Sequence, residues 1–119
     1  MQTLDSAAHN QFRELCAQAY EQYDAGDYRA ALRLFYRGWN LIPKPQVDYE
    51  ESGWALSAIG DAYFKLAQYQ QGREALVSAL HCDNMRSNPF VHLRLGQCLY
   101  KENQLDAAIK HLHYAWQRG

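Results

Sequence analysis

The chain has 119 residues, of which 48% are hydrophobic and 21% are charged, and its formal net charge is -1. This length suits a single domain spanning residues 1–119 with a sizeable core. A near-neutral chain without a run of Lys or Arg residues argues against nucleic acid and against an anionic membrane as partners. The N-terminus lacks a basic start followed by an apolar region, and no stretch reaches the roughly 18 apolar residues of a membrane span, so we expect a cytoplasmic protein.

Apolar residues recur at helical spacing along the whole chain, and no segment has the pattern of a strand. Asn88-Pro89 is a typical helix start, with Asn as the cap and Pro in the first turn. Pro43 and Pro45 end the second helix. The sequence therefore predicts six helices, near residues 5–24, 27–41, 50–66, 69–82, 89–102 and 105–118.

The longest interruption, residues 40–53, contains the acidic residues Asp48, Glu50 and Glu51. We interpret them as the first turn of the third helix, where the helix dipole favours negative charge. Binding of a basic partner is the alternative interpretation.

An internal repeat underlies the helices. Gly60 and Gly96 lie 36 positions apart, each after an aliphatic residue in the first helix of a pair. Gly26, Ala67 and Asn103 occupy matching positions in the turns. A period of this size is typical of a solenoid of stacked helix pairs. Three units fit the chain, at approximately 5–43, 50–84 and 88–119.

These residues resemble the tetratricopeptide repeat, whose pattern contains Leu-Gly-x-x-Tyr in its first helix and then Gly-x-Tyr, Ala, Phe and Pro. The best matches are Ile59-Gly60-Asp61-Ala62-Tyr63, Leu95-Gly96-Gln97-Cys98-Leu99, and Gly26-Asp27-Tyr28 with Ala31, Phe35 and Pro43. The resemblance implies an all-α fold, a right-handed superhelical solenoid of three such units. It also implies that Gly60 and Gly96 let the paired helices approach closely.

In such a solenoid the first helix of each pair lines the concave surface. On helical wheels, one side of the third and fifth helices carries aromatic and charged residues, and the first helix places Arg13 and Cys16 on the same side. Aromatic residues and Arg are typical of protein-binding surfaces. Packing between units is the alternative for each aromatic residue, and solvation or intramolecular pairing is the alternative for each charge. The predicted partner-binding residues are Tyr20, Tyr23, Trp54, Asp61, Phe64, Phe90, Arg94, Gln97, Tyr100 and Lys101.

Catalytic and metal sites are not expected. His111 and His113 point to different sides of one helix, so they cannot bind one ion together. No nucleophile, base and orienting group occur in a recognisable motif. The odd number of cysteines, Cys16, Cys82 and Cys98, indicates buried reduced thiols. We therefore expect a non-catalytic protein without a cofactor or metal.

Two narrower resemblances bear on the partner. The clamp that some tetratricopeptide repeats use for the acidic tail of heat-shock chaperones would fall on Cys16, Tyr20, Ala58, Phe90 and Arg94, and only Arg94 agrees. The segments LIPKP, AIGDAYF and NPFVHLRLGQCLY resemble short bacterial repeat proteins found beside polymorphic toxins, which implies neutralisation of a cognate toxin domain.

The favoured function is therefore a module that binds a protein partner in its concave groove, with toxin immunity as the specific role. A scaffold, adaptor or secretion chaperone is the alternative, and an RNA-binding helical repeat is a remote one.

The last predicted helix carries Ile109, Leu112 and Trp116 on one face. Stacked repeats normally cover such an edge with a polar cap or an extra helix. We expect a second copy, the partner, or residues that follow this sequence to cover it. A homodimer through the C-terminal helix is one such arrangement.

Overall fold

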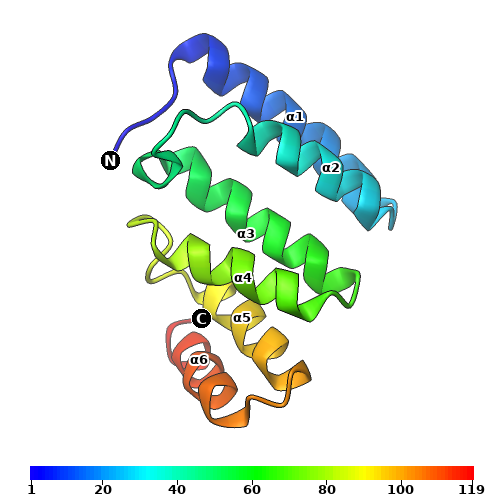
Figure 1. Cartoon of the computed structure of the whole chain (residues 1–119), viewed down its shortest axis with the longest axis vertical. Helices are drawn as coiled ribbons and strands as arrows, with labels where there is room; N and C mark the ends of the chain where they lie inside the picture. The colour runs from blue at the N-terminus through cyan, green and yellow to red at the C-terminus, as the bar shows by residue number, and fades with distance from the viewer.

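The computed structural model describes residues 1–119, which form six α-helices stacked as three antiparallel pairs (Figure 1). A 3-10 turn, η1 (Gln46–Asp48), precedes the second pair, and no strand is present apart from an isolated bridge between Gln2 and Tyr49. The predicted all-α solenoid is confirmed, and each predicted helix end lies within two residues of the observed one. The helices are α1 (Ser6–Asp24), α2 (Tyr28–Trp39), α3 (Glu50–Lys65), α4 (Tyr69–Leu80), α5 (Pro89–Lys101) and α6 (Leu105–Arg118).

Side-chain caps fix the starts of three helices. Asp5 accepts a hydrogen bond from the Ala8 amide at the start of α1, and Asp27 accepts one from Ala30 in α2. Asn88 caps α5 and Pro89 occupies its first turn, as the sequence predicts. Each such cap stabilises a helix by about 1 kcal/mol.

The turn inside each helix pair uses the left-handed backbone region. Gly26, Ala67 and Asn103 have φ values of 82°, 60° and 64°. Gly and Asn tolerate this conformation, whereas Ala pays a steric cost there. The three turns are therefore equivalent, although only one of them carries glycine.

Close helix contacts explain the two repeated glycines. A Cβ atom at Gly60 would lie 2.7 Å from Leu76 Cδ2, and one at Gly96 would lie 2.7 Å from Leu112 Cγ. Neither position can hold a side chain without moving the second helix of its pair. The prediction that both are packing glycines is confirmed.

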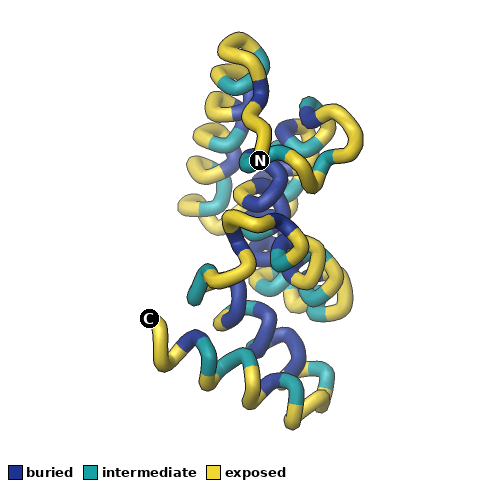
Figure 2. Tube along the Cα trace, turned by 90° about the vertical axis from the view of Figure 1, so that its left-hand side faces the viewer, coloured by how far each residue is buried: buried dark blue, intermediate teal, exposed yellow.

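Buried residues run along the middle of the stack, and exposed residues cover its outside (Figure 2). The largest buried cluster joins α3, α4, α5 and α6 through residues such as Leu76, Val91 and Leu95. Cys82 and Cys98 are buried in it as free thiols, as predicted, whereas Cys16 is only half-buried. Each helix pair thus depends on its neighbour for a complete core.

The N-terminal segment is tied to the start of α3. Glu51 is fully buried, and its carboxylate accepts hydrogen bonds from the Leu4 amide at 3.2 Å and from His9 Nδ1 at 2.7 Å. Gln2 adds backbone hydrogen bonds to Asp48 and Glu50. Glu50 and Glu51 do lie in the first turn of α3, as predicted, but Asp48 belongs to η1. Glu51 therefore anchors the strap formed by residues 1–5.

None of the six α-helices combines the length and hydrophobicity that crossing a membrane requires.

Candidate functional site

The first helices of the three pairs, α1, α3 and α5, follow one another along the 43 Å axis of the molecule (Figure 1). Between them lie two hollows of about 520 Å³ and 360 Å³. Both hollows are lined by Tyr20, Trp54 and Ala58, so they form one continuous groove. We call this surface the concave groove.

Three aromatic side chains in the concave groove are only partly covered. Tyr20, Trp54 and Phe90 are 49%, 42% and 42% exposed. Tyr20 packs edge-on against Phe35, and Trp54 packs edge-on against His9. Each ring is thus held on one side and open on the other, as expected for anchors of a polypeptide partner.

A polar network joins α3 and α5 beneath these rings. Arg94 Nε donates a 2.6 Å hydrogen bond to Asp61 Oδ1, and Arg94 Nη1 donates a 2.8 Å bond to Gln97 Oε1. The guanidinium carbon lies 4.6 Å from the ring centre of Phe64 and 5.3 Å from that of Phe90. Intramolecular pairing, one of the alternatives that the sequence allows for these charges, is therefore observed for Asp61 and Arg94.

Tyr23 extends this network to α1. Burial and a hydrogen bond to the neighbouring Asp61 carboxylate raise the pKa of Tyr23. Tyr23 also packs on the cluster around Phe35 and Ile59. The Asp61, Arg94 and Gln97 side chains thus connect α3 to α5, and Tyr23 of α1 lies beside Asp61.

The ten predicted residues therefore separate into three groups. Tyr20, Trp54, Asp61 and Phe90 line the second hollow together. Tyr23, Phe64, Arg94 and Gln97 form or support the network beneath the rings. Tyr100 and Lys101 are exposed at the C-terminal end of α5 and do not line either hollow.

Several lining residues escaped prediction. His9 and Phe12 line the first hollow beside Arg13 and Cys16, and Met85 contributes to the second from the connection between α4 and α5. The positions on α1 share the spacing of Tyr20, which could have identified them, but Met85 has no periodic signal. Burial raises the pKa of Cys16 to about 11, so its thiol stays protonated and is a poor nucleophile.

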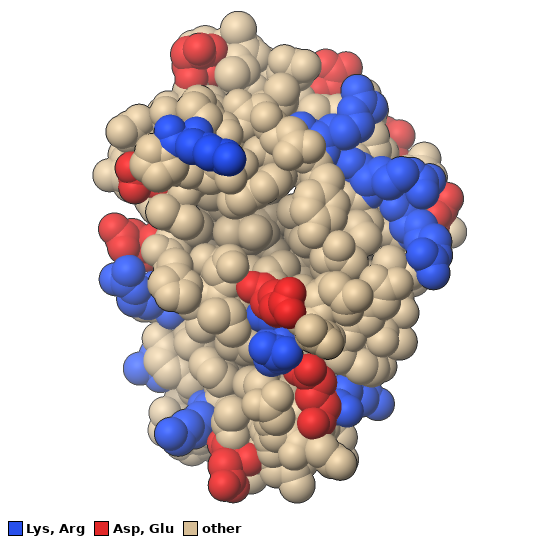
Figure 3. Space-filling model, viewed as in Figure 1, with Lys and Arg blue, Asp and Glu red and all other residues tan.

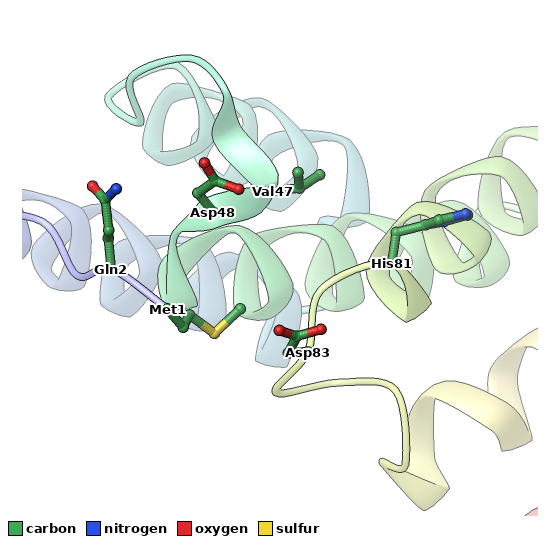
Figure 4. Close-up of a pocket in the computed structure, with 6 residues that line it drawn as sticks. All are labelled: Met1, Gln2, Val47, Asp48, His81 and Asp83. Atoms are coloured by element: carbon green, nitrogen blue, oxygen red, sulfur yellow. The ribbon is translucent and has the colours of Figure 1, made fainter.

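A separate hollow of about 280 Å³ lies between the N-terminal segment, η1 and the connection after α4 (Figure 4). Its two carboxylates, Asp48 and Asp83, come from different segments of the chain. The third titratable side chain, His81, forms a hydrogen bond through Nδ1 with the Val77 carbonyl of the preceding helical turn. This hollow does not assemble groups that could act together chemically.

Charge is unevenly distributed on the outside of the solenoid. Arg29, Arg33 and Arg37 are exposed along α2 at intervals of one helical turn, and none of them forms an ion pair. Figure 3 shows this basic row over α2, whereas both signs are mixed over the lower half of the same face. The sequence contains no run of basic residues here, because the three arginines are four positions apart and come together only on one side of the helix.

Two histidines meet between α5 and α6. His92 Nε2 lies 2.9 Å from the Arg86 carbonyl oxygen, which can only accept, so this nitrogen carries a proton and donates the hydrogen bond. His92 Nδ1 then accepts a 2.9 Å hydrogen bond from His111 Nδ1. Burial, His92 and Lys110 lower the pKa of His111. No group of three or more His, Cys, Asp or Glu side chains is placed to hold a metal ion.

The three helix pairs, their left-handed turns and their packing glycines define a tetratricopeptide-repeat-like helical solenoid. No protein-family model matches the chain, and no curated protein sequence matches it. Among solved structures, the chain is similar to the type III secretion translocator chaperone SycD of Yersinia enterocolitica, described as an alternative dimer. The TM-score is 0.78 at 18% identity, covering 95% of this chain and 79% of SycD. At this identity the likeness shows the fold.

Proposed function

We propose that this protein is a non-catalytic binding module, of the chaperone or adaptor kind, that holds an extended segment of a client protein in the concave groove. The observation that carries the proposal is the continuous apolar groove with three half-exposed aromatic rings on α1, α3 and α5. The similarity to a secretion chaperone supports this role over toxin immunity. Toxin neutralisation, RNA binding and a cytoplasmic location stay predictions from the sequence.

The composition of the groove indicates the kind of client segment. The charged pair Asp61 and Arg94 is satisfied internally, and Arg13 is the remaining charged side chain of the first hollow. An extended chain advances about 3.3 Å per residue, so a segment of about 12 residues is roughly 40 Å long and nearly spans the 43 Å axis. We propose a client segment with bulky apolar side chains and neutral or acidic flanks.

We also propose that the three helix pairs, at approximately 5–43, 50–84 and 88–119, form one domain. The largest buried cluster includes residues from both the second and the third pair, which supports this proposal. A groove that crosses all three pairs requires such a unit.

A peptide selection tests the proposed function. Random peptides of about 12 residues displayed on phage are selected against the chain, and the most enriched peptide is labelled and titrated by fluorescence anisotropy. Trp54→Ala and Phe90→Ala should each weaken its binding about 30-fold, the loss typical of a buried anchor. Val77→Ala, at an exposed apolar residue of α4 outside the groove, is the matched control.

The outcome distinguishes the groove from other surfaces. Equal affinities for the parent, Trp54→Ala and Phe90→Ala would place the peptide elsewhere and would refute the proposal. A loss with Val77→Ala alone would do the same. Circular dichroism of each variant establishes that the helices are retained.

A further inference from the structure

The outward face of α6 is an uncovered apolar surface. Leu105, Ile109 and Trp116 are 49%, 63% and 80% exposed. Leu112 lies between them at the edge of this face, half-buried because one side of its side chain packs against Gly96 of α5. The four residues are separated by four, three and four positions, which is the spacing of a helix–helix seam. Figure 2 shows the exposed outer turns of this last helix at the bottom of the stack. We call these four residues the α6 seam.

The repeat shows what kind of element fits the α6 seam. Thirty-six positions earlier, Leu76 of α4 occupies the place of Leu112. Leu76 packs against Gly60 of α3 in its own pair and also belongs to the buried cluster that joins α4 to α5. Arg73 of α4, which matches Ile109, forms a 2.6 Å ion pair with Glu102 at the end of α5. The surface of α6 that corresponds to the α5-facing side of α4 therefore suits packing against a helix. It is more apolar than its counterpart on α4, because Ile109 replaces Arg73.

The other end of the stack does not provide that helix. Outside the concave groove, the exposed positions of α1 are mainly polar. Stacking the α6 seam of one copy against α1 of another would strip water from these side chains without replacing their hydrogen bonds. The exposed polar residues of α1 include Asn10, Gln11, Glu14, Gln18 and Glu21.

We propose that the α6 seam pairs with the α6 seam of a second copy, with the two helices antiparallel. A twofold axis between Ile109 and Leu112 would place these residues against each other and each Trp116 beside the Leu105 of the other copy. Asp106, which forms no ion pair within the chain, would lie near His113 of the other copy. The antiparallel helix dipoles favour the same arrangement.

The dimer should be concentration-dependent. One helix pair buries less surface than the roughly 800 Å² per partner of a standard interface. We therefore expect a dissociation constant in the micromolar range, on the order of 1–100 μM.

Sedimentation equilibrium of the 119-residue chain tests the pairing. The parent should shift from monomer to dimer across the micromolar range. Trp116→Glu and Ile109→Glu should each weaken the dimer about 30-fold or more, because each change alters the seam in both copies. Trp54→Glu, the same substitution in the concave groove, is the matched control and should dimerise like the parent.

Cysteine cross-linking in a Cys16→Ser background tests the orientation. Ile109→Cys lies next to the twofold axis and should form a disulfide between copies under mild oxidation. In an antiparallel pair the two Trp116 positions are about 16 Å apart along the axis, from a rise of 1.5 Å per residue, so Trp116→Cys should not. Efficient cross-linking through Trp116→Cys would overturn the antiparallel arrangement.

Three results would overturn the dimer itself. The first is a parent that stays monomeric at about 500 μM, several times the weakest expected dissociation constant. The second is a dimer that neither seam variant weakens, and the third is a dimer that Trp54→Glu breaks. The pairing of two copies goes beyond the proposed function. A failure of the dimer can be distinguished from a failure of peptide binding in the concave groove. Trp116→Glu should bind the groove peptide with parental affinity whether or not the chain dimerises.

Discussion

The two ends of the solenoid are finished in different ways. At the N-terminal end, residues 1–5 are strapped onto α3 by the buried carboxylate of Glu51, and the outward residues of α1 are polar. At the C-terminal end, α6 leaves Ile109 and Trp116 open to solvent. The outward face of α1 is therefore polar, whereas that of α6 is apolar.

The first and third helix pairs also differ in the contacts that hold them. The α5–α6 contact depends on a glycine, Gly96, and on a pair of histidines, whereas the N-terminal end depends on hydrogen bonds to one carboxylate. Substitutions at these positions should consequently affect the two ends by different mechanisms.

The largest expected effect is at the C-terminal pair. In Gly96→Leu the new side chain would collide with Leu112, whose backbone nitrogen lies 3.1 Å from the Cβ position and cannot turn away. We expect a loss of about 3 kcal/mol or more in the free energy of unfolding, measured by urea denaturation. Gly38→Ala in the first pair meets Phe12 at 3.3 Å and should change stability by less than about 1 kcal/mol. Equal losses in both variants would contradict this difference between the pairs.

The next effect concerns the N-terminal strap. Glu51→Ala removes the acceptor for the Leu4 amide and for His9, and leaves the buried amide without a partner. We expect a loss of about 2–3 kcal/mol and faster proteolysis of residues 1–5. Glu50→Ala, which also lies in the first turn of α3, should cost less than about 1 kcal/mol. A loss confined to Glu50→Ala would show that the helix dipole, and not the strap, matters there.

A smaller effect at the C-terminal end should depend on pH. The folded-state pKa of His111 lies below its ordinary value of 6.5, so the unfolded chain binds the proton more tightly. Stability should therefore fall as the pH decreases from about 7.5 to about 5, and His111→Gln should flatten this dependence. An identical slope in His111→Gln and the parent would rule out this origin.

The smallest effect lies between the two ends. Ala67 holds a φ of 60° in the middle turn, where the first turn has Gly26 and the last has Asn103. Ala67→Gly should raise the free energy of unfolding by about 0.5–1 kcal/mol, because glycine removes the steric cost of this conformation. Asn103→Gly should change it less. Thermal denaturation of both variants gives the comparison, and a destabilised Ala67→Gly would contradict it.

Most of the fold could be predicted from the sequence because its signals are local and repeated. Helical spacing, Asn88-Pro89 and the matching turn positions each depend on neighbours within a few residues. The packing role of Gly60 and Gly96 also follows from their equivalent places in the repeat.

The candidate site is harder to predict from the sequence than the fold, because its contacts lie between helices. The pairing of Asp61 with Arg94 joins residues 33 positions apart, and the anchor at Glu51 joins residues 47 positions apart. A helical wheel assigns a residue to a side of its own helix but not to a partner on another. A helical wheel therefore places Trp54, Phe90, Asp61 and Arg94 on the same side of their helices. It does not show that the two rings are half-exposed while the two charges pair with each other.

The network of Tyr23, Asp61, Arg94 and Gln97 has a mechanical consequence. Because the hydrogen bonds of Arg94 to Asp61 and Gln97 already join α3 to α5 in the free chain, we expect the groove to keep its curvature on binding. The protein then loses little conformational freedom on association, and the ordering cost falls on the client segment. Affinity should accordingly rise with the stiffness of that segment, so a client stiffened by proline would bind more tightly than a flexible one with the same apolar side chains.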